Sequence, residues 1–292
     1  MSTADSALRT RQSAVATSLR AWWTILRISL EERLVYRGDF MLGTLMRFLP
    51  LVTQIFLWTA VFSAMQSDNI AGYTKDQMIA YLLLVNVARA FSSMPGLASS
   101  ISRSILDGSI KKYLIQPVDM IGFLLISRVA HKLVYYLVAF IPFALVFFLC
   151  RGFFSGWPPP GVFMAFLASL LMAFLLGFFV EACIGMIGFW FLEVTSLLFV
   201  YMLLSYFLSG QMFPIELLDG VKLAGNLSVG DLVRILPLQY MAYFPTAVFL
   251  GKVAGAELVQ GILIQFAWVV FFTFASRLMF NRGVRKYSAF GG

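Results

Sequence analysis

Charged residues are scarce in this chain of 292 amino acids. They make up 12% of it, whereas about a quarter of the residues in a soluble globular domain are charged. Hydrophobic residues make up 60%, and the mean hydropathy is +0.86. This balance excludes an ordinary soluble domain and predicts an integral membrane protein.

Cysteine and histidine are also rare. Cys150 and Cys183 lie in or beside apolar stretches, and the single histidine, His131, has no second histidine or cysteine at metal-ligand spacing. We interpret both cysteines as packing residues and expect no metal site. The sequence has no Gly-rich loop followed by Lys and Ser or Thr, which is the usual cradle for nucleotide phosphates. We therefore expect no catalytic residue, no bound cofactor and no enzyme activity in this chain by itself.

The N-terminal region has no apolar core followed by a small-residue cleavage site, so we expect no secretory signal peptide. Residues 1–14 are polar and predict a disordered cytoplasmic tail. From Val15 to Arg37 the apolar and charged residues fall on different faces of a helical wheel, which predicts an amphipathic helix over about 15–39. Its Trp22 and Trp23 favour the membrane surface. A soluble helix packed on another subunit is the alternative.

Apolar stretches long enough to cross about 30 Å of hydrocarbon follow this helix. One of them is too long for a single helix, and Glu193, Thr195 and Ser196 interrupt it, so we expect a turn there. We therefore predict an all-α membrane protein with six transmembrane helices between residues 40 and 280. The predicted helices are Phe40–Met65, Gln77–Ser99, Lys132–Cys150, Gly161–Phe191, Thr195–Phe213 and Glu257–Phe280.

Lysine and arginine gather in three segments that six spans would place on one side of the membrane. These are the N-terminal region, the connector between the second and third spans, and the basic tail over 281–292. The positive-inside rule makes that side the cytoplasm and places both termini there. The net charge of +8 is then explained by topology and by contact with anionic lipid, and not by binding of nucleic acid.

The segment Pro214–Ala256, between the fifth and sixth spans, is too long for a simple turn and too apolar for a solvated loop. Pro214, Pro237 and Pro245 separate short helix-compatible pieces. Backbone exposed to lipid must satisfy its own hydrogen bonds. We therefore predict a short helical hairpin on the outer side, over about 214–245.

Two ionisable residues lie inside predicted spans, where a charge is costly and usually functional. Arg89 is near the middle of the second span, and Glu181 lies in the inner half of the fourth. We hypothesise that they form an ion pair within the membrane. Such a pair lines a translocation path or is a purely structural link between spans, and the sequence leaves both alternatives open.

Several motifs in order resemble the membrane subunits of type-2 ABC exporters. The connector Leu106-Asp107-Gly108-Ser109-Ile110-Lys111-Lys112-Tyr113-Leu114-Ile115-Gln116-Pro117 resembles the family's coupling helix, within a coupling segment over about 101–117. The segments Leu208–Pro214 and Leu236–Tyr240 resemble the family's fifth-span exit and outer hairpin, with Pro214, Pro237 and Tyr240 as marker residues. The segment Phe189–Val194 resembles the family's inner turn with its acidic residue, here Glu193.

The resemblance implies a permease subunit of an ATP-driven exporter in a bacterial inner membrane. It implies two copies of a separate ATPase that binds ATP and magnesium, and a second permease that is identical or homologous. Gly108, Ser109, Lys111, Lys112, Tyr113, Leu114, Pro117 and Glu193 would then couple the permease to the ATPase. The cargo expected is an amphipathic small molecule, a lipid-like molecule or a glycan precursor. An ATP-independent secondary transporter and a membrane scaffold are the alternatives.

Overall fold

A computed structural model of the chain describes residues 20–32, 37–65, 68–115, 119–154, 156–191, 194–224 and 227–287. The chain divides into two compact units. Unit 1 comprises Met1–Met46 and Lys111–Ala144, and unit 2 comprises Arg47–Ile110 and Leu145–Gly292. Two of the three unit boundaries fall within the long helices α2 (Arg37–Met65) and α6 (Met120–Leu149), and the third lies between Ile110 and Lys111.

Unit 1 contains a helix over 20–32, the short α5 (Lys111–Ile115) and most of α6. Asp119 caps α6, because its Oδ2 accepts the backbone N–H of Gly122 at 2.8 Å. A Cβ built on Gly122 would lie 3.0 Å from Trp22, so the helix over 20–32 packs closely on the start of α6. The amphipathic helix is thus helical where the structure describes it, and its location at the membrane surface stays a prediction.

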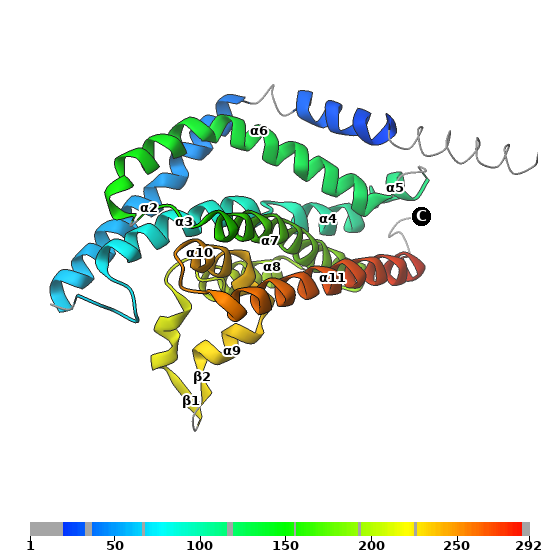
Figure 1. Cartoon of the computed structure of the whole chain (residues 1–292). Helices are drawn as coiled ribbons and strands as arrows, with labels where there is room; N and C mark the ends of the chain where they lie inside the picture. Colours follow the sequence, from blue (N-terminus) through cyan, green and yellow to red (C-terminus); the bar gives the residue numbers. More distant parts are fainter. Residues whose placement is uncertain are drawn as a thin grey trace, which may run out of the picture. The chain divides into compact units, whose positions relative to one another are not determined.

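Unit 2 is built around α7 (Pro160–Met186), which packs against α3 (Lys75–Ser92), α4 (Leu97–Leu106) and α11 (Gly255–Lys286) (Figure 1). Small residues recur at a spacing of four on α7, at Ser169, Ala173, Gly177 and Gly185, with Glu181 between the last two. All four are buried. Residues four apart share one face of a helix, and small residues there allow two backbones to approach. In this small-residue stripe, Gly177 and Gly185 allow α3 and α4 to lie close to α7, whereas Ser169 hydrogen-bonds Gln265 of α11.

The lengths of the helices can be compared with the six predicted spans. Four segments are long and apolar enough to cross a membrane, namely Lys75–Leu106, Met120–Leu149, Pro160–Phe189 and Gly255–Lys286. Two shorter apolar helices, Leu49–Met65 and α8 (Thr195–Leu208), match the first and fifth predictions. At 1.5 Å per residue, the 14 residues of α8 extend about 21 Å, less than the hydrocarbon core. The all-helical membrane character agrees with the prediction, and the count of six spans stays a prediction.

Several helix ends differ from the predicted ones. The third helix begins at Met120 rather than at Lys132, and the last one continues to Lys286 rather than ending at Phe280. The fifth ends at Leu208 rather than at Phe213, because Gly210 turns the chain with φ +78°. No side chain fits at Gly210, since a Cβ there would lie 2.7 Å from the Tyr81 hydroxyl.

The segment Pro214–Ala256, which was predicted to lie on the outer side and is called the outer segment below, differs from a simple helical hairpin. After α8 the chain forms the helical turn η3 (Ile215–Gly220) and then two antiparallel strands, β1 (Lys222–Ala224) and β2 (Leu227–Ser228). The helices α9 (Val229–Ile235), η4 (Pro237–Met241) and α10 (Tyr243–Phe249) follow. The three predicted helix-compatible pieces lie in helical turns. The strands were not predicted, because they are too short to show an alternating pattern.

Candidate functional site

The second predicted span is broken between α3 and α4. Residues 93–96 separate the two helices, and they include Pro95 and a Gly96 with φ +73°. Proline has no backbone N–H, and it disfavours helical backbone at the residue before it. The backbone N–H of Met94 therefore turns away from its own helix and donates to Glu181 Oε1 at 3.3 Å. Glu181 thus supplies a hydrogen bond that an unbroken helix would supply itself.

The position of Glu181 follows from the small-residue stripe of α7. It lies four residues after Gly177 and four before Gly185, so it faces the same neighbours. A Cβ built on Gly177 would lie only 2.0 Å from the Ser92 carbonyl oxygen, and one on Gly185 would lie 2.7 Å from the Ala98 carbonyl oxygen. These two contacts, one on each side of the break, fix Glu181 opposite it.

Arg89 lies one helical turn before the break, and its carbonyl oxygen accepts the N–H of Ser93 at 2.9 Å. Its side chain is half-buried. Both Arg89 and Glu181 exert an electrostatic effect on the hydroxyl of Tyr201, which lies on α8. The two predicted charges and this tyrosine therefore gather from α3, α7 and α8. The direct ion pair between Arg89 and Glu181 stays a prediction.

The predicted coupling segment begins at the end of α4. Gly108 adopts φ +78°, and the Ile110 N–H donates to the Ser104 carbonyl at 2.8 Å, which closes the helix end. Asp107 Oδ1 accepts the N–H of Ser109 at 2.9 Å. Ile110 is buried, so the turn is firmly held within unit 2.

The next part of that segment, α5, has an exposed apolar surface. None of its residues is buried, and the side chains of Leu114 and Ile115 are 40% and 83% exposed. The ring of Tyr113 packs on that of Phe123, with ring centres 5.6 Å apart. The Lys112 ammonium lies 4.9 Å from the centre of the Tyr113 ring. Lys111 and Lys112 are exposed. Pro117 and Glu193, which were also predicted to act in coupling, lie outside the described residues.

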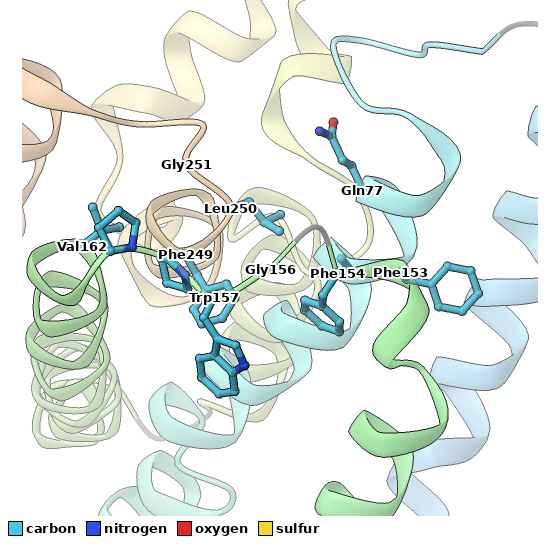
Figure 2. A pocket seen from close by; sticks show the side chains of 12 residues that line it. Gln77, Phe153, Phe154, Gly156, Trp157, Val162, Phe249, Leu250 and Gly251 are labelled. Carbon is cyan, nitrogen blue, oxygen red and sulfur yellow. The ribbon is translucent and has the colours of Figure 1, made fainter.

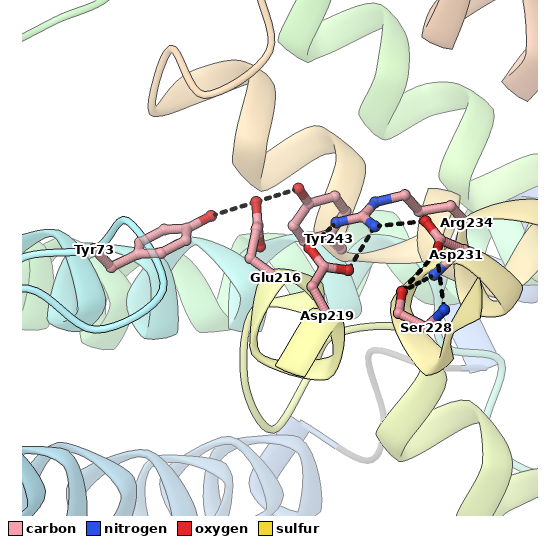
Figure 3. Close-up of polar contacts among 7 residues, drawn as sticks. All are labelled: Tyr73, Glu216, Asp219, Ser228, Asp231, Arg234 and Tyr243. Carbon is pink, nitrogen blue, oxygen red and sulfur yellow. Dashed lines mark hydrogen bonds and ion pairs between the residues drawn. The ribbon is translucent and has the colours of Figure 1, made fainter. Parts of the chain in front are cut away.

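The outer segment contains a carboxylate held by two tyrosines, which sequence reasoning missed (Figure 3). The Tyr243 hydroxyl donates to Glu216 Oε1 at 2.5 Å, and the Tyr73 hydroxyl donates to the same oxygen at 3.3 Å. Glu216 Oε2 is buried and has no hydrogen-bond partner among the described residues. We call these three residues the carboxylate cluster.

Each member of the carboxylate cluster is placed by its local backbone. Tyr73 ends a tight turn, in which Ile70 and Tyr73 exchange backbone hydrogen bonds across Ala71 and Gly72, both with positive φ. Pro214 precedes the first residue of η3, and Tyr243 is the first residue of α10. Burial raises the pKa of Tyr73 and of Tyr243, and the charge of Glu216 raises both further.

Lys252 is a nearby cation with several contacts. Its Nζ donates to the Gly72 carbonyl at 2.7 Å and to Gln77 Oε1 at 2.9 Å, and it lies 4.4 Å from the centre of the Tyr73 ring. Burial lowers the pKa of Lys252, and the charge of Glu216 opposes that effect. The lysine thus ties the loop after α10 to the start of α3.

Pro237 and Tyr240, the remaining predicted residues of the outer segment, lie in η4. Pro237 is the first residue of η4, and the Tyr240 carbonyl accepts Gln265 Nε2 at 3.0 Å. Arg234 holds both carboxylate oxygens of Asp219, at 2.6 and 2.7 Å (Figure 3). Ser228 and Asp231 form a capping box at the start of α9. These contacts join η3, α9 and η4 to α11.

Within the described part of the chain, no group of three or more His, Cys, Asp or Glu side chains could hold a metal ion. Among curated proteins, no sequence matches this chain. A family model described as an ABC-2 family transporter protein matches residues 48–291. That range includes the broken span, the coupling segment and the carboxylate cluster. Since the match covers most of the sequence, the chain belongs to the ABC-2 family of transporter proteins.

Proposed function

We propose that the chain is the permease subunit of an ATP-driven exporter. It carries an amphipathic small molecule, a lipid-like molecule or a glycan precursor out of the cytoplasm or the inner leaflet of a bacterial inner membrane. Its six spans place both termini in the cytoplasm. The observation that carries this proposal is the family match over 48–291. The four long apolar helices support it.

ATP is hydrolysed by a separate ATPase, present in two copies, which binds ATP and magnesium. A second permease, identical or homologous, completes the assembly. Membership of the family implies such an ATPase partner and a membrane context. The exposed apolar side chains of α5 support docking there, because they lie on a short helix outside the long apolar helices, where exposed apolar side chains favour a protein partner. Lys111 and Lys112 would meet acidic groups on that partner.

The coupling segment then transmits movement of the ATPase to the spans. In this scheme ATP closes the ATPase dimer, α5 moves with it, and the firmly held turn at Gly108 passes the displacement to α4. From α4 it reaches the break beside Glu181. The polar groups around that break, Arg89, Glu181 and Tyr201, would respond first among the membrane helices.

The test is purification of the tagged chain in mild detergent from its native membrane, with mass spectrometry of co-purifying proteins. We expect an ATPase at a fixed ratio to the chain. Tyr113→Asp and Leu114→Asp should reduce the recovered ATPase at least about tenfold, since a charge in an apolar contact is costly to bury. Val221→Asp is the matched control, because Val221 is 53% exposed and lies in the outer segment. Equal recovery of ATPase from all three variants would disprove the docking assignment, and a consistent absence of ATPase from the unaltered chain would disprove the permease function.

A further inference from the structure

Unit 2 contains a cavity that the permease assignment does not explain. Its volume is about 250 Å³, and its walls come from the start of α3, the loop before α7, the first turn of α7 and the end of α10. Aromatic side chains dominate it, with Phe153, Phe154, Trp157 and Phe249 among the lining residues (Figure 2). We call it the aromatic pocket.

The rings of the aromatic pocket meet mostly edge to face. Phe249 meets Phe154 and Trp157 edge to face, with ring centres 6.4 and 6.2 Å apart and interplanar angles of 84° and 65°. A third edge contact, from Phe166 at 5.0 Å, holds Phe249 in place. Phe147 stacks on one side of Phe154, with ring centres 5.7 Å apart, whereas Trp157 and Phe249 have no stacked ring partner among the described residues, so a flat guest can lie against them. Trp157 is 82% exposed, which leaves this wall accessible from outside.

One polar side chain, Gln77, gives the pocket a defined hydrogen-bond preference. Its Oε1 accepts from Lys252 Nζ at 2.9 Å and from the Thr74 N–H at 3.4 Å. An ammonium and a backbone N–H can only donate, so they fix the amide orientation. The two N–H donors of Gln77 Nε2 are therefore available, because this atom has no hydrogen-bond partner among the described residues. The pocket therefore offers a donor and favours a guest with an acceptor oxygen.

The charges around the pocket exclude a cationic guest. Aromatic walls alone can bind cations through their faces. Here none of the described lining residues is charged, and the nearest fixed charge acting on Gln77 is the Lys252 ammonium. Among the lining residues that the structure describes, none is a carboxylate that could offset the desolvation of a second cation.

We propose that the aromatic pocket binds a non-cationic ring compound that carries an acceptor oxygen. The ring lies against Phe154, Trp157 and Phe249, and Gln77 Nε2 donates to the oxygen. The volume lies near the lower limit of ligand pockets, about 300–1,000 Å³, so the guest is a body of about two fused rings and not a whole lipid. This inference goes beyond the permease function, because binding needs neither the ATPase nor transport.

The experiment is equilibrium dialysis of the purified chain in lipid nanodiscs against 2-acetylnaphthalene, with empty nanodiscs as the reference. We expect saturable binding of about one molecule per chain above the uptake by empty discs. The hydrocarbon 2-ethylnaphthalene, which lacks the acceptor, should bind about fivefold more weakly, the usual effect of one hydrogen bond. The trimethyl(2-naphthyl)ammonium ion should bind more weakly than the ketone as well.

Two variants locate the site. Val162→Trp fills the pocket, because Val162 lines it, and should lower the affinity for the ketone at least about tenfold. Leu171→Trp makes the same kind of change on α7 at a side chain that is 61% exposed and does not line the pocket, and should bind as the unaltered chain does. A third variant tests the hydrogen bond. Gln77→Glu keeps an acceptor for Lys252 but removes the N–H donor, so it should weaken binding of the ketone and leave binding of 2-ethylnaphthalene unchanged.

Two outcomes would overturn the proposal. Equal uptake by the unaltered chain, by Val162→Trp and by empty discs would mean partitioning into the membrane only and would overturn the site. Tighter binding of the ammonium ion than of the ketone would overturn the ligand class. Size-exclusion profiles and melting temperatures of the variants confirm folding. Because no ATPase is present, failure here leaves the permease function untouched.

Discussion

The Tyr243 hydroxyl donates a hydrogen bond to Glu216 Oε1 across 2.5 Å, and through this bond the first residue of α10 holds the helical turn η3. Tyr73 reaches the same carboxylate oxygen from a loop 143 residues earlier in the chain. The carboxylate cluster therefore joins the turn before α3 to the outer segment. Its contacts lead to the first two predictions.

The first prediction concerns the hydroxyl of Tyr243. A hydrogen bond to a charged group contributes about 1.5–3 kcal/mol, and Tyr243 is buried, so Tyr243→Phe should lower the free energy of unfolding by about that amount. Tyr287→Phe is the matched control, because the Tyr287 hydroxyl is buried without a partner in the described chain and its removal should cost little. Melting temperature and hydrogen exchange of residues 215–220 measure the effect. Similar losses in both variants would show that the bond to Glu216 adds no stability.

The second prediction is a loss of stability at high pH. The pKa values of Tyr73 and Tyr243 are raised above the usual value near 10, chiefly by burial and also by the charge of Glu216. A group whose pKa is raised by folding contributes stability that is complete below its unfolded pKa and is lost as the pH rises above it. The melting temperature should therefore fall as the pH rises above about 10. Tyr243→Phe should reduce this pH dependence. An unchanged dependence would show that ionisation of Tyr243 does not cause the loss of stability.

The third prediction concerns the charges beside the broken span. If Arg89 and Glu181 form an ion pair, Arg89→Ala and Glu181→Ala should each destabilise the protein more than the double variant does, because a lone buried charge is costlier than none. Melting temperatures of the three variants in detergent provide the comparison. Additive losses would argue against the pair.

Glu181 also accepts the Met94 N–H, and that role can be tested separately. Glu181→Gln keeps an acceptor oxygen, whereas Glu181→Leu leaves the N–H without one, at a cost of about 1–3 kcal/mol. We expect faster amide exchange at Met94 in the leucine variant and nearly unchanged exchange in the glutamine variant. Equal exchange in both would mean that Glu181 does not protect the break.

The fourth prediction concerns the small-residue stripe of α7. A methyl group at Gly177 would lie 2.0 Å from the Ser92 carbonyl oxygen, so Gly177→Ala should force α3 from α7 and cost about 1–3 kcal/mol. Gly161→Ala is the control on the same helix, since nothing lies within 4 Å of its built Cβ. It should be neutral or slightly stabilising, as alanine is a better helix former. A harmless Gly177→Ala would disprove the close approach of the two helices.

Much of the helical fold could be predicted from apolar stretches, because a helix in lipid satisfies its own backbone. The helix ends were harder to predict. The break after Ser92 carries a local signal, Pro95 followed by Gly96, but the apolar run before it, together with Leu97 and Ala98 after it, outweighs that signal. The early start at Met120 is set by the capping carboxylate of Asp119.

The candidate sites were predictable only where a charge lies in an apolar run. Arg89 and Glu181 were found in this way. The Met94 N–H is a backbone group, so no side chain in the sequence marks it as a partner. Glu216 lies in an apolar piece and could have been noticed by the same rule, but its tyrosines come from distant segments, and only tertiary structure brings them together.

The break in the second span also changes which helices share a mechanical connection. In an unbroken helix the Met94 N–H would bond within its own helix, and tilting one half would strain the other. Here that donor is held by α7, while the backbone between α3 and α4 turns through a proline and a left-handed glycine. A change in the tilt of α4 is therefore felt first by α7, and α3, with the carboxylate cluster near its N-terminal end, can stay in place while α4 moves.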